Sequence, residues 1–185
     1  MEFTIRPYTE KDREEVRGIC ERSSAHRVRT EQRRLFLRKM QCDYYLDCEP
    51  EHCFVASDGE KLVGCILCSS DCELFARRYL DKYIPKLKEY SKVQAFLARG
   101  EVLHYSEHAN FFPAHFRLFV LPECRRQGVG TALTERLCAH LSDLHIKGIL
   151  AFAPRKSEAA PALAKKCGFS ALRDKGDTIP WGMDL

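Results

Sequence analysis

The fold of this chain is indicated most clearly by residues 116–131, which read FRLFVLPECRRQGVGT. The first six are apolar apart from Arg117 and predict a strand, which Pro122 ends because it has no N–H to donate to a sheet. Gly128 and Gly130 then predict a tight turn whose backbone a ligand can approach closely. The residues that follow predict a helix with one apolar stripe, formed by Val129, Leu133, Leu137 and Leu141.

The start of this predicted helix suits an anion. The first N–H groups of a helix have no partner within it and carry the positive end of the helix dipole. A pyrophosphate fits such a position. Gly128 and Gly130 alone are equally compatible with an ordinary strand-to-helix turn, so the flanking strand and helix carry much of the argument.

The composition limits the class of protein. A chain of 185 residues with 45% hydrophobic residues is enough for a single domain over 1–185 with its own core. The net charge of +4 arises from 30 basic and 26 acidic residues, and this mild excess does not indicate a nucleic-acid partner. The basic cluster between Arg27 and Lys39 is explained most simply as a solvated helix face.

Neither a membrane span nor a metal site is expected. No apolar run approaches the ~20 residues that cross a bilayer, and the N-terminus has no apolar signal region, so we expect a cytoplasmic protein without a membrane partner. The ten cysteines then indicate reduced thiols. Cys65, Cys68 and Cys72 have metal-like spacing, but no second such pair and no suitably spaced histidine pair completes a tetrahedral set.

The rest of the pattern predicts strands and helices in mixed order. Thr9 is expected to cap a helix that continues through Ile19. Asp58-Gly59 predicts a hairpin turn. Strands are expected at 3–6, 52–56, 61–68, 149–153, 169–172 and 179–185, and further helices at 31–40, 75–87, 90–99 and 157–166, with Pro85 breaking the long helical segment.

Two motifs resemble those of the Gcn5-related N-acetyltransferase (GNAT) superfamily. Its acyl-CoA signature is Arg or Gln, two residues, Gly, one residue, and Gly or Ala, and Arg125, Gly128 and Gly130 match it in register. The later Cys167-Gly168-Phe169 is similar to the family's Leu-Gly-Phe, at the family's spacing. This resemblance, over about residues 113–172, implies an α/β fold with a central twisted mixed sheet and flanking helices.

The resemblance also implies acetyl-CoA as the acyl donor. Two central parallel strands, here about 115–121 and 149–153, would splay apart and admit the pantetheine arm. Backbone groups of one strand would hold this arm and the acyl carbonyl, and the turn after that strand would hold the pyrophosphate. The residues implied for this role are Leu118, Phe119, Val120, Arg125, Arg126, Gln127, Gly128, Val129, Gly130, Thr131 and Ser157.

Residues 71–112 form an unusually long connection, which we expect to be a helical insert because a structureless loop of this length is improbable in a compact domain. With Phe112-Pro113-Ala114-His115, the insert resembles a subgroup of stand-alone bacterial acetyltransferases, which are similar to the acetyltransferase-like domain of O-GlcNAc hydrolases. The resemblance implies a cofactor but no particular acceptor. We expect the insert to form the acceptor wall, with Tyr79 and Tyr83 on it.

Acyl transfer from a thioester to an amine needs a general base and a donor for the developing oxyanion. His115 is the first candidate for the base, because strand alternation places it on the same face as Arg117. An arginine in a central strand requires an open cleft or a carboxylate partner. A structural histidine at the strand entrance is the alternative. We assign the catalytic role to His115 and, upstream of it, Glu107, whose rivals are Glu101, His104 and His108.

Two positions depart from the family pattern. Counted back from Gly168, Ala164 stands where the family commonly has a tyrosine general acid, and Ser157 stands where it commonly has an asparagine. Ala164 can do no proton chemistry. We therefore predict an N-acetyltransferase that acts on a primary amine of a small molecule. A protein or peptide N-acetyltransferase and an inactive acyl-CoA-binding module stay as alternatives, and a homodimer is left open.

Overall fold

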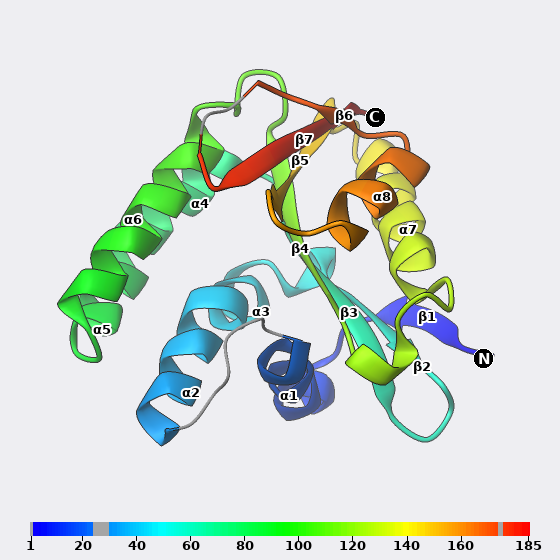
Figure 1. The fold of residues 1–185 in the computed structure, drawn as a ribbon, viewed down its shortest axis with the longest axis horizontal. Helices are drawn as coiled ribbons and strands as arrows, with labels where there is room; N and C mark the ends of the chain where they lie inside the picture. The colour runs from blue at the N-terminus through cyan, green and yellow to red at the C-terminus, as the bar shows by residue number, and fades with distance from the viewer. Residues whose placement is uncertain (1, 24–29, 174–175) are drawn as a thin grey trace.

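The computed structural model describes residues 2–23, 30–173 and 176–185. Within these residues the strands form one seven-stranded sheet in the order β1-β2-β3-β4-β5-β7-β6 (Figure 1). The strands are β1 (Thr4–Pro7), β2 (Phe54–Ser57), β3 (Leu62–Ser69), β4 (Ala114–Val120), β5 (Gly148–Pro154), β6 (Ser170–Ala171) and β7 (Thr178–Asp184).

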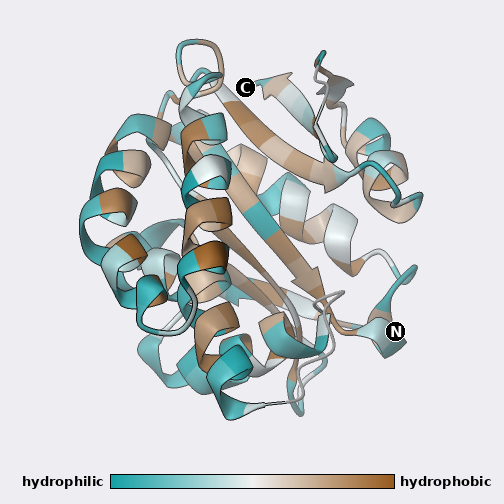
Figure 2. Ribbon diagram, turned by 60° about the vertical axis from the view of Figure 1, so that its left-hand side comes forward, coloured by the Kyte–Doolittle hydropathy of each residue, from teal (hydrophilic) through white to brown (hydrophobic). Residues whose placement is uncertain are grey.

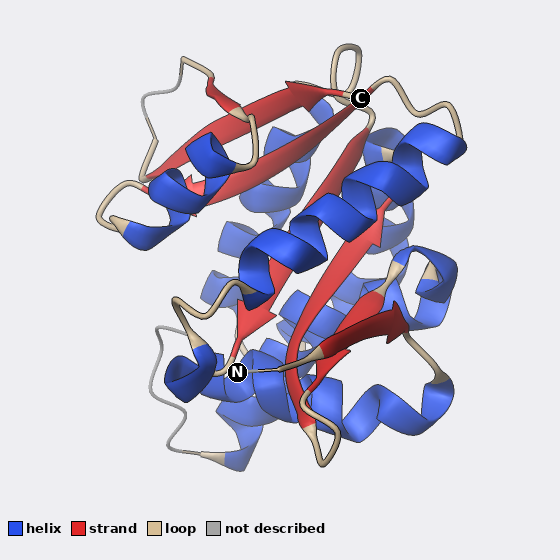
Figure 3. Cartoon of the chain, turned by 90° about the vertical axis from the view of Figure 1, so that its right-hand side faces the viewer, coloured by secondary structure: helices blue, strands red, loops and turns tan. Residues whose placement is uncertain are grey.

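Helices cover both faces of this sheet, with α7 and α8 on one side and α1 to α6 on the other (Figures 1 and 3). The α-helices are α1 (Arg13–Ser23), α2 (Glu31–Arg38), α3 (Tyr44–Cys48), α4 (Cys72–Arg78), α5 (Ile84–Lys88), α6 (Lys92–Ser106), α7 (Val129–Asp143) and α8 (Ala159–Lys166). Two π-helical turns, η2 (Lys39–Asp43) and η4 (Tyr79–Tyr83), connect neighbouring helices, and shorter 3-10 turns are η1 (Glu10–Asp12), η3 (Pro50–His52) and η5 (Pro122–Cys124). No helix in the described part of the chain is long and apolar enough to cross a membrane.

The sheet is mixed, as expected. Strands β1 to β4 pair antiparallel in sequence, and β5 pairs antiparallel with β7. Strands β4 and β5 pair in parallel, and within the described residues their register is limited to Ala114↔Ile149 and His115↔Leu150. From Phe116 onward β4 has no partner in β5, so the two central strands splay apart as the resemblance implied.

The local signals around residues 116–131 are confirmed. The apolar stripe of α7 is buried against the sheet, with Leu133, Leu137 and Leu141 fully buried. At Gly64 on β3, an added Cβ would lie 3.0 Å from Val129 Cγ1, which shows how closely α7 approaches the strands. Figure 2 shows the apolar residues concentrated along the central strands.

The insert is helical, but its break lies elsewhere than predicted. Pro85 does not separate two helices, because it falls in the first turn of α5, where its missing N–H is tolerated. The π-helical turn η4 before it accommodates the proline within a continuous helical run. The break comes at Ser91, whose hydroxyl accepts a hydrogen bond from Gln94 N and caps α6.

Candidate functional site

A cavity of about 1080 Å³ lies where β4 and β5 separate. Its long walls are the splayed parts of these two strands, and α8 and the turn before α7 close it from one side. Most of the residues implied to contact the acyl donor line this cavity: Leu118, Phe119, Val120, Arg125, Arg126, Gly128, Gly130 and Thr131.

Three others of that set do not line it. Gln127 is exposed, and its amide donates to the carbonyl of Glu123. Val129 is buried in the core. Ser157 accepts a hydrogen bond from Ala160 N at 3.3 Å, so its hydroxyl is engaged at the start of α8.

The turn before α7 has the geometry of an anion site. Gly128 has φ +88°, and an added Cβ there would meet nothing within 4 Å, so glycine serves the backbone conformation and leaves the space in front of the helix open. Gly130 serves packing, because a Cβ there would lie 3.3 Å from Leu163 Cδ2 of α8. The first N–H groups of α7 therefore face an accessible space lined by glycine.

The free edge of β4 offers backbone groups to a ligand. Leu121 N donates to Val63 O at 3.0 Å, so Leu121 bonds toward β3, and strand alternation turns the N–H groups of Leu118 and Val120 toward the cavity. Ser23 Oγ donates to Val120 O at 3.0 Å, which agrees with this orientation. An extended amide-bearing chain can therefore bond along β4 where β5 is absent.

Arg117 and Glu101 form an ion pair on the α6 side of the cavity, and both line it. Arg117 Nε also donates to Tyr45 Oη at 3.3 Å. Burial opposes the charge of the guanidinium, but the Glu101 carboxylate outweighs it and holds the pKa of Arg117 above its ordinary value. Arg117 thus has both the cleft and the carboxylate that its place in a central strand required.

His115 lies two residues before Arg117 on β4. It is fully buried and is not among the residues that line the cavity. Its Nε2 is 2.9 Å from Tyr45 Oη, and its Nδ1 is 3.3 Å from Cys72 Sγ. Burial, reinforced by the charge of Arg117, holds the pKa of His115 well below its ordinary value. This placement matches the structural alternative, and the assignment of His115 as the base stays a prediction.

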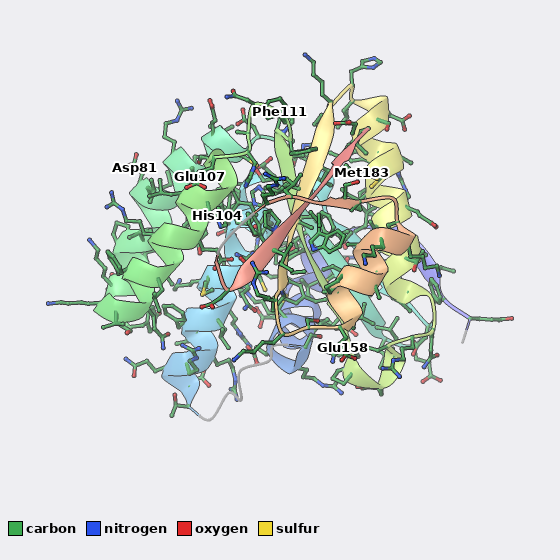
Figure 4. The ribbon with its side chains drawn as sticks, turned by 45° about the horizontal axis from the view of Figure 1, so that its top comes forward. Asp81, His104, Glu107, Phe111, Glu158 and Met183 are labelled. Carbon is green, nitrogen blue, oxygen red and sulfur yellow. The ribbon has the colours of Figure 1, made fainter. Side chains whose placement is uncertain are left out.

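Glu107 is exposed at the C-terminal end of α6, close to His104 (Figure 4). Its carboxylate and the rings of His104 and His108 place ligand atoms within 4.8 Å of one another, a nitrogen and oxygen donor set that zinc accepts. None of the three lines the cavity. The spacing H-x-x-E-H was overlooked in the sequence, and it brings His104 in the last turn of α6 together with Glu107 and His108 in the turn that follows.

Two residues that the sequence did not single out line the cavity with unsatisfied polar atoms. Among the described residues, Gln41 Oε1 and Trp181 Nε1 are the buried side-chain polar atoms that have no hydrogen-bond partner. Gln41 belongs to η2 and Trp181 to β7, and both line the cavity. Buried polar groups are normally satisfied, so these two atoms are expected to meet a ligand or a water in the cavity.

The comparisons with known proteins agree with this geometry. Residues 19–169 match the acetyltransferase (GNAT) family. The solved structure of SsHAT is 23% identical with a TM-score of 0.85, and the alignment covers 100% of this chain and 98% of that one. The ribosomal-protein-S18-alanine N-acetyltransferase from Escherichia coli is 16% identical with a TM-score of 0.60, covering 99% and 94%.

A third similar fold is that of the Drosophila melanogaster polyamine N-acetyltransferase, which is 15% identical with a TM-score of 0.64 over 100% of both chains. No curated protein matches the sequence. Because the family match spans most of its length, the chain belongs to the GNAT family and is an acetyl-CoA-dependent N-acetyltransferase. The finer resemblance to the O-GlcNAc hydrolase-associated subgroup stays a prediction.

Acetyl-CoA is the acyl donor of this family, and the residues present fit it. The open turn at Gly128 and the start of α7 suit its pyrophosphate, and the free edge of β4 suits its amide-bearing arm. The unpartnered Gln41 and Trp181 lie where bound groups can satisfy them.

Proposed function

We propose that this acetyltransferase acetylates the primary amine of a small cationic molecule, which enters from the α6 side of the cavity. The observation that carries the proposal is the buried Gln41 Oε1, for which residues 2–23, 30–173 and 176–185 supply no hydrogen-bond partner. Glu101 lines the same cavity from α6. A carbonyl oxygen and a carboxylate accept hydrogen bonds and donate none, so together they select a donor-rich group such as an ammonium.

Glu101 is the proposed proton acceptor. Its carboxylate is partly exposed at 34% of the side chain, so it can contact both Arg117 and an incoming amine. The amine must lose a proton before its nitrogen attacks the thioester carbonyl, and Glu101 takes that proton directly or through a water. His115 is buried behind Tyr45 and, on this account, positions the tyrosine that contacts Arg117.

A small acceptor agrees better with the charges than a protein acceptor. For a protein or peptide acceptor, the basic stretch between Arg27 and Lys39 would help to dock an acidic partner, and residues 27–29 lie outside the described residues. In the described part, Arg34 pairs with Glu31 and Glu21, and Arg38 pairs with Glu21 and Glu14. Acidic side chains of α1 and α2 thus already neutralise much of this surface.

The test is a thiol-release assay with acetyl-CoA and a panel of primary amines, including polyamines and peptides with free N-termini. Small dibasic amines should give the highest kcat/KM. Glu101→Gln should lower kcat/KM by ~10²-fold or more, as removal of a general base does. Gln41→Met should lower it by about tenfold, the scale of a lost hydrogen bond to a charged group.

Glu89→Gln is the matched control, because Glu89 is an exposed glutamate after α5 and does not line the cavity. Glu107→Gln tests the competing assignment of Glu107 as the proton acceptor. If Glu107→Gln or His115→Gln abolishes turnover while Glu101→Gln does not, the proton acceptor is the one that the sequence predicted and the present assignment is wrong. Preference for peptides over all small amines would contradict the proposed acceptor class.

A further inference from the structure

The indole N–H of Trp181 lies buried in the wall of the cavity, and no hydrogen-bond acceptor in the described part of the chain meets it. Trp181 is 3% exposed. Leaving such a donor unsatisfied costs about 1–3 kcal/mol, which is reason to ask what satisfies it when the cavity is filled.

The sheet register defines the face from which Trp181 acts. Trp181 pairs with Ala151 on β5, so both side chains lie on one face, and the next residue, Phe152, lies on the other. Phe152 packs against Tyr105 of α6 with ring centroids 4.8 Å apart. Trp181 therefore points to the opposite face, which α7 and α8 cover and which also carries Ala164.

The register also shows where Trp181 lies along the gap between β4 and β5. The paired region of β4 and β5 ends at His115↔Leu150, and Ala151 is the next residue along β5. Trp181 therefore lies beside the closed end of the splay, while Gly128 lies at the open end. An acyl-CoA whose pyrophosphate lies at Gly128 reaches Trp181 with the end of the arm that carries the sulfur.

Other donors on this wall are committed or weak. Thr134 Oγ1 donates to Gly130 O at 2.9 Å, and Lys166 is exposed at the rim. Cys167 offers only a thiol, which is a weak donor. Ala164 carries no polar group. The indole is thus the strong uncommitted donor among the described residues at the closed end of this wall.

We infer that the Trp181 N–H donates a hydrogen bond to the sulfur of the bound acyl donor and stabilises it as it leaves as a thiolate. The inference rests on the acyl transfer assigned above. The amine nitrogen bonds to the carbonyl carbon, the carbon–sulfur bond breaks, and the sulfur keeps the electron pair. The indole keeps its proton and acts as a fixed dipole. Glu101 takes the proton that the ammonium loses before attack and releases it to solvent, and the second proton, which the nitrogen loses as the amide forms, follows the same route. A donor of this kind gains strength as its acceptor becomes charged.

The test uses CoA and desulfo-CoA, which differ only in the thiol. Trp181 is the one tryptophan of the chain, so its fluorescence reports its own contacts. CoA should quench and shift the emission of the wild-type protein, and desulfo-CoA should change it much less. By calorimetry at a pH at which the CoA thiol is ionised, Trp181→Phe should lower CoA affinity by about tenfold and leave desulfo-CoA affinity unchanged.

Equal emission changes with both ligands, or equal affinity losses for both in Trp181→Phe, would overturn the inference and leave Trp181 a structural residue. This test needs no acceptor amine. Failure of the proposed acceptor class would appear in the amine panel, with the CoA and desulfo-CoA difference intact.

Discussion

Arg117 of β4 and Glu101 of α6 form an ion pair that joins the central sheet to the helical insert inside the cavity wall. The pair explains how an arginine is tolerated in a central strand. It also places a carboxylate beside the position at which the two central strands separate. The insert therefore contributes to the site through α6.

Breaking this pair should destabilise the fold. Arg117→Gln removes the partner of Glu101 and a donor to Tyr45. We expect a loss of about 1–3 kcal/mol in the free energy of unfolding, measured by urea denaturation. Arg34→Gln is the control, because Arg34 pairs with Glu31 on the surface, and it should cost about 1 kcal/mol or less. Equal losses would mean that the Arg117 pair is no more than a surface contact.

The turn before α7 should decide acetyl-CoA binding. Gly128→Glu places a carboxylate in the open space before the helix, and it should abolish the thermal stabilisation that acetyl-CoA gives the wild-type protein. Gly128→Ala should cost about 1 kcal/mol of stability, because alanine is strained at positive φ, yet retain the ligand-induced shift. A shift that survives Gly128→Glu would exclude this turn as the pyrophosphate site. Gly130→Glu should also remove the shift, but it disturbs α8 through Leu163 as well.

A hydroxyl restored on α8 should assist thiol release. Ala164 lines the cavity, so Ala164→Tyr brings a phenol into it, and Ala164→Phe brings the same ring without the hydroxyl. We expect Ala164→Tyr to have the higher kcat of the two, in a stopped-flow assay of thiol release, because only the phenol can donate a proton or a hydrogen bond. Ala164→Ser should change little. Identical kcat values for the tyrosine and phenylalanine variants would show that bulk, and not the hydroxyl, determines the effect.

His115 should make stability depend on pH. Its pKa is lowered in the folded protein, so below about pH 6.5 the unfolded chain binds a proton that the folded protein does not. The contribution of the neutral His115 to the free energy of unfolding is therefore complete above about pH 6.5 and is lost as the pH is lowered. The free energy of unfolding of the wild-type protein should drop by about 1–2 kcal/mol more than that of His115→Gln between pH 7 and pH 5.

The same variant examines the predicted catalytic role of His115. If the histidine only positions Tyr45, the pH–rate profile of His115→Gln should keep the shape of the wild-type profile at a lower amplitude. A flattened rising limb would instead support His115 as the base.

The sequence predicts those parts of the fold that are determined by residues close together in the chain. Pro122, the glycine turn and the four-residue apolar spacing act locally, so the strand, turn and helix around residues 116–131 were predicted correctly, as was the hairpin at Asp58-Gly59. The helix break predicted at Pro85 is wrong, because the π-helical turn before the proline accommodates it within the helical run.

The site was less predictable because its side chains come from distant segments. The burial of His115 depends on Tyr45 and Cys72, which lie 70 and 43 residues away. Tyr79 and Tyr83, expected on the acceptor wall, are buried with their hydroxyls bonded to η2 and α3, and Glu101 and Tyr105 line the cavity in their place. Nothing in the sequence marks Gln41 or Trp181, whose importance lies in a buried polar atom that has no hydrogen-bond partner among the described residues.

The location of acetyl-CoA along the free edge of β4 is tested most directly by amide hydrogen exchange with and without the ligand. We predict that acetyl-CoA protects peptides covering 116–121 and 128–131, in particular the amides of Leu118 and Val120, and leaves 54–57 of β2 unchanged. Protection confined to other segments, or none at saturating acetyl-CoA, would contradict it.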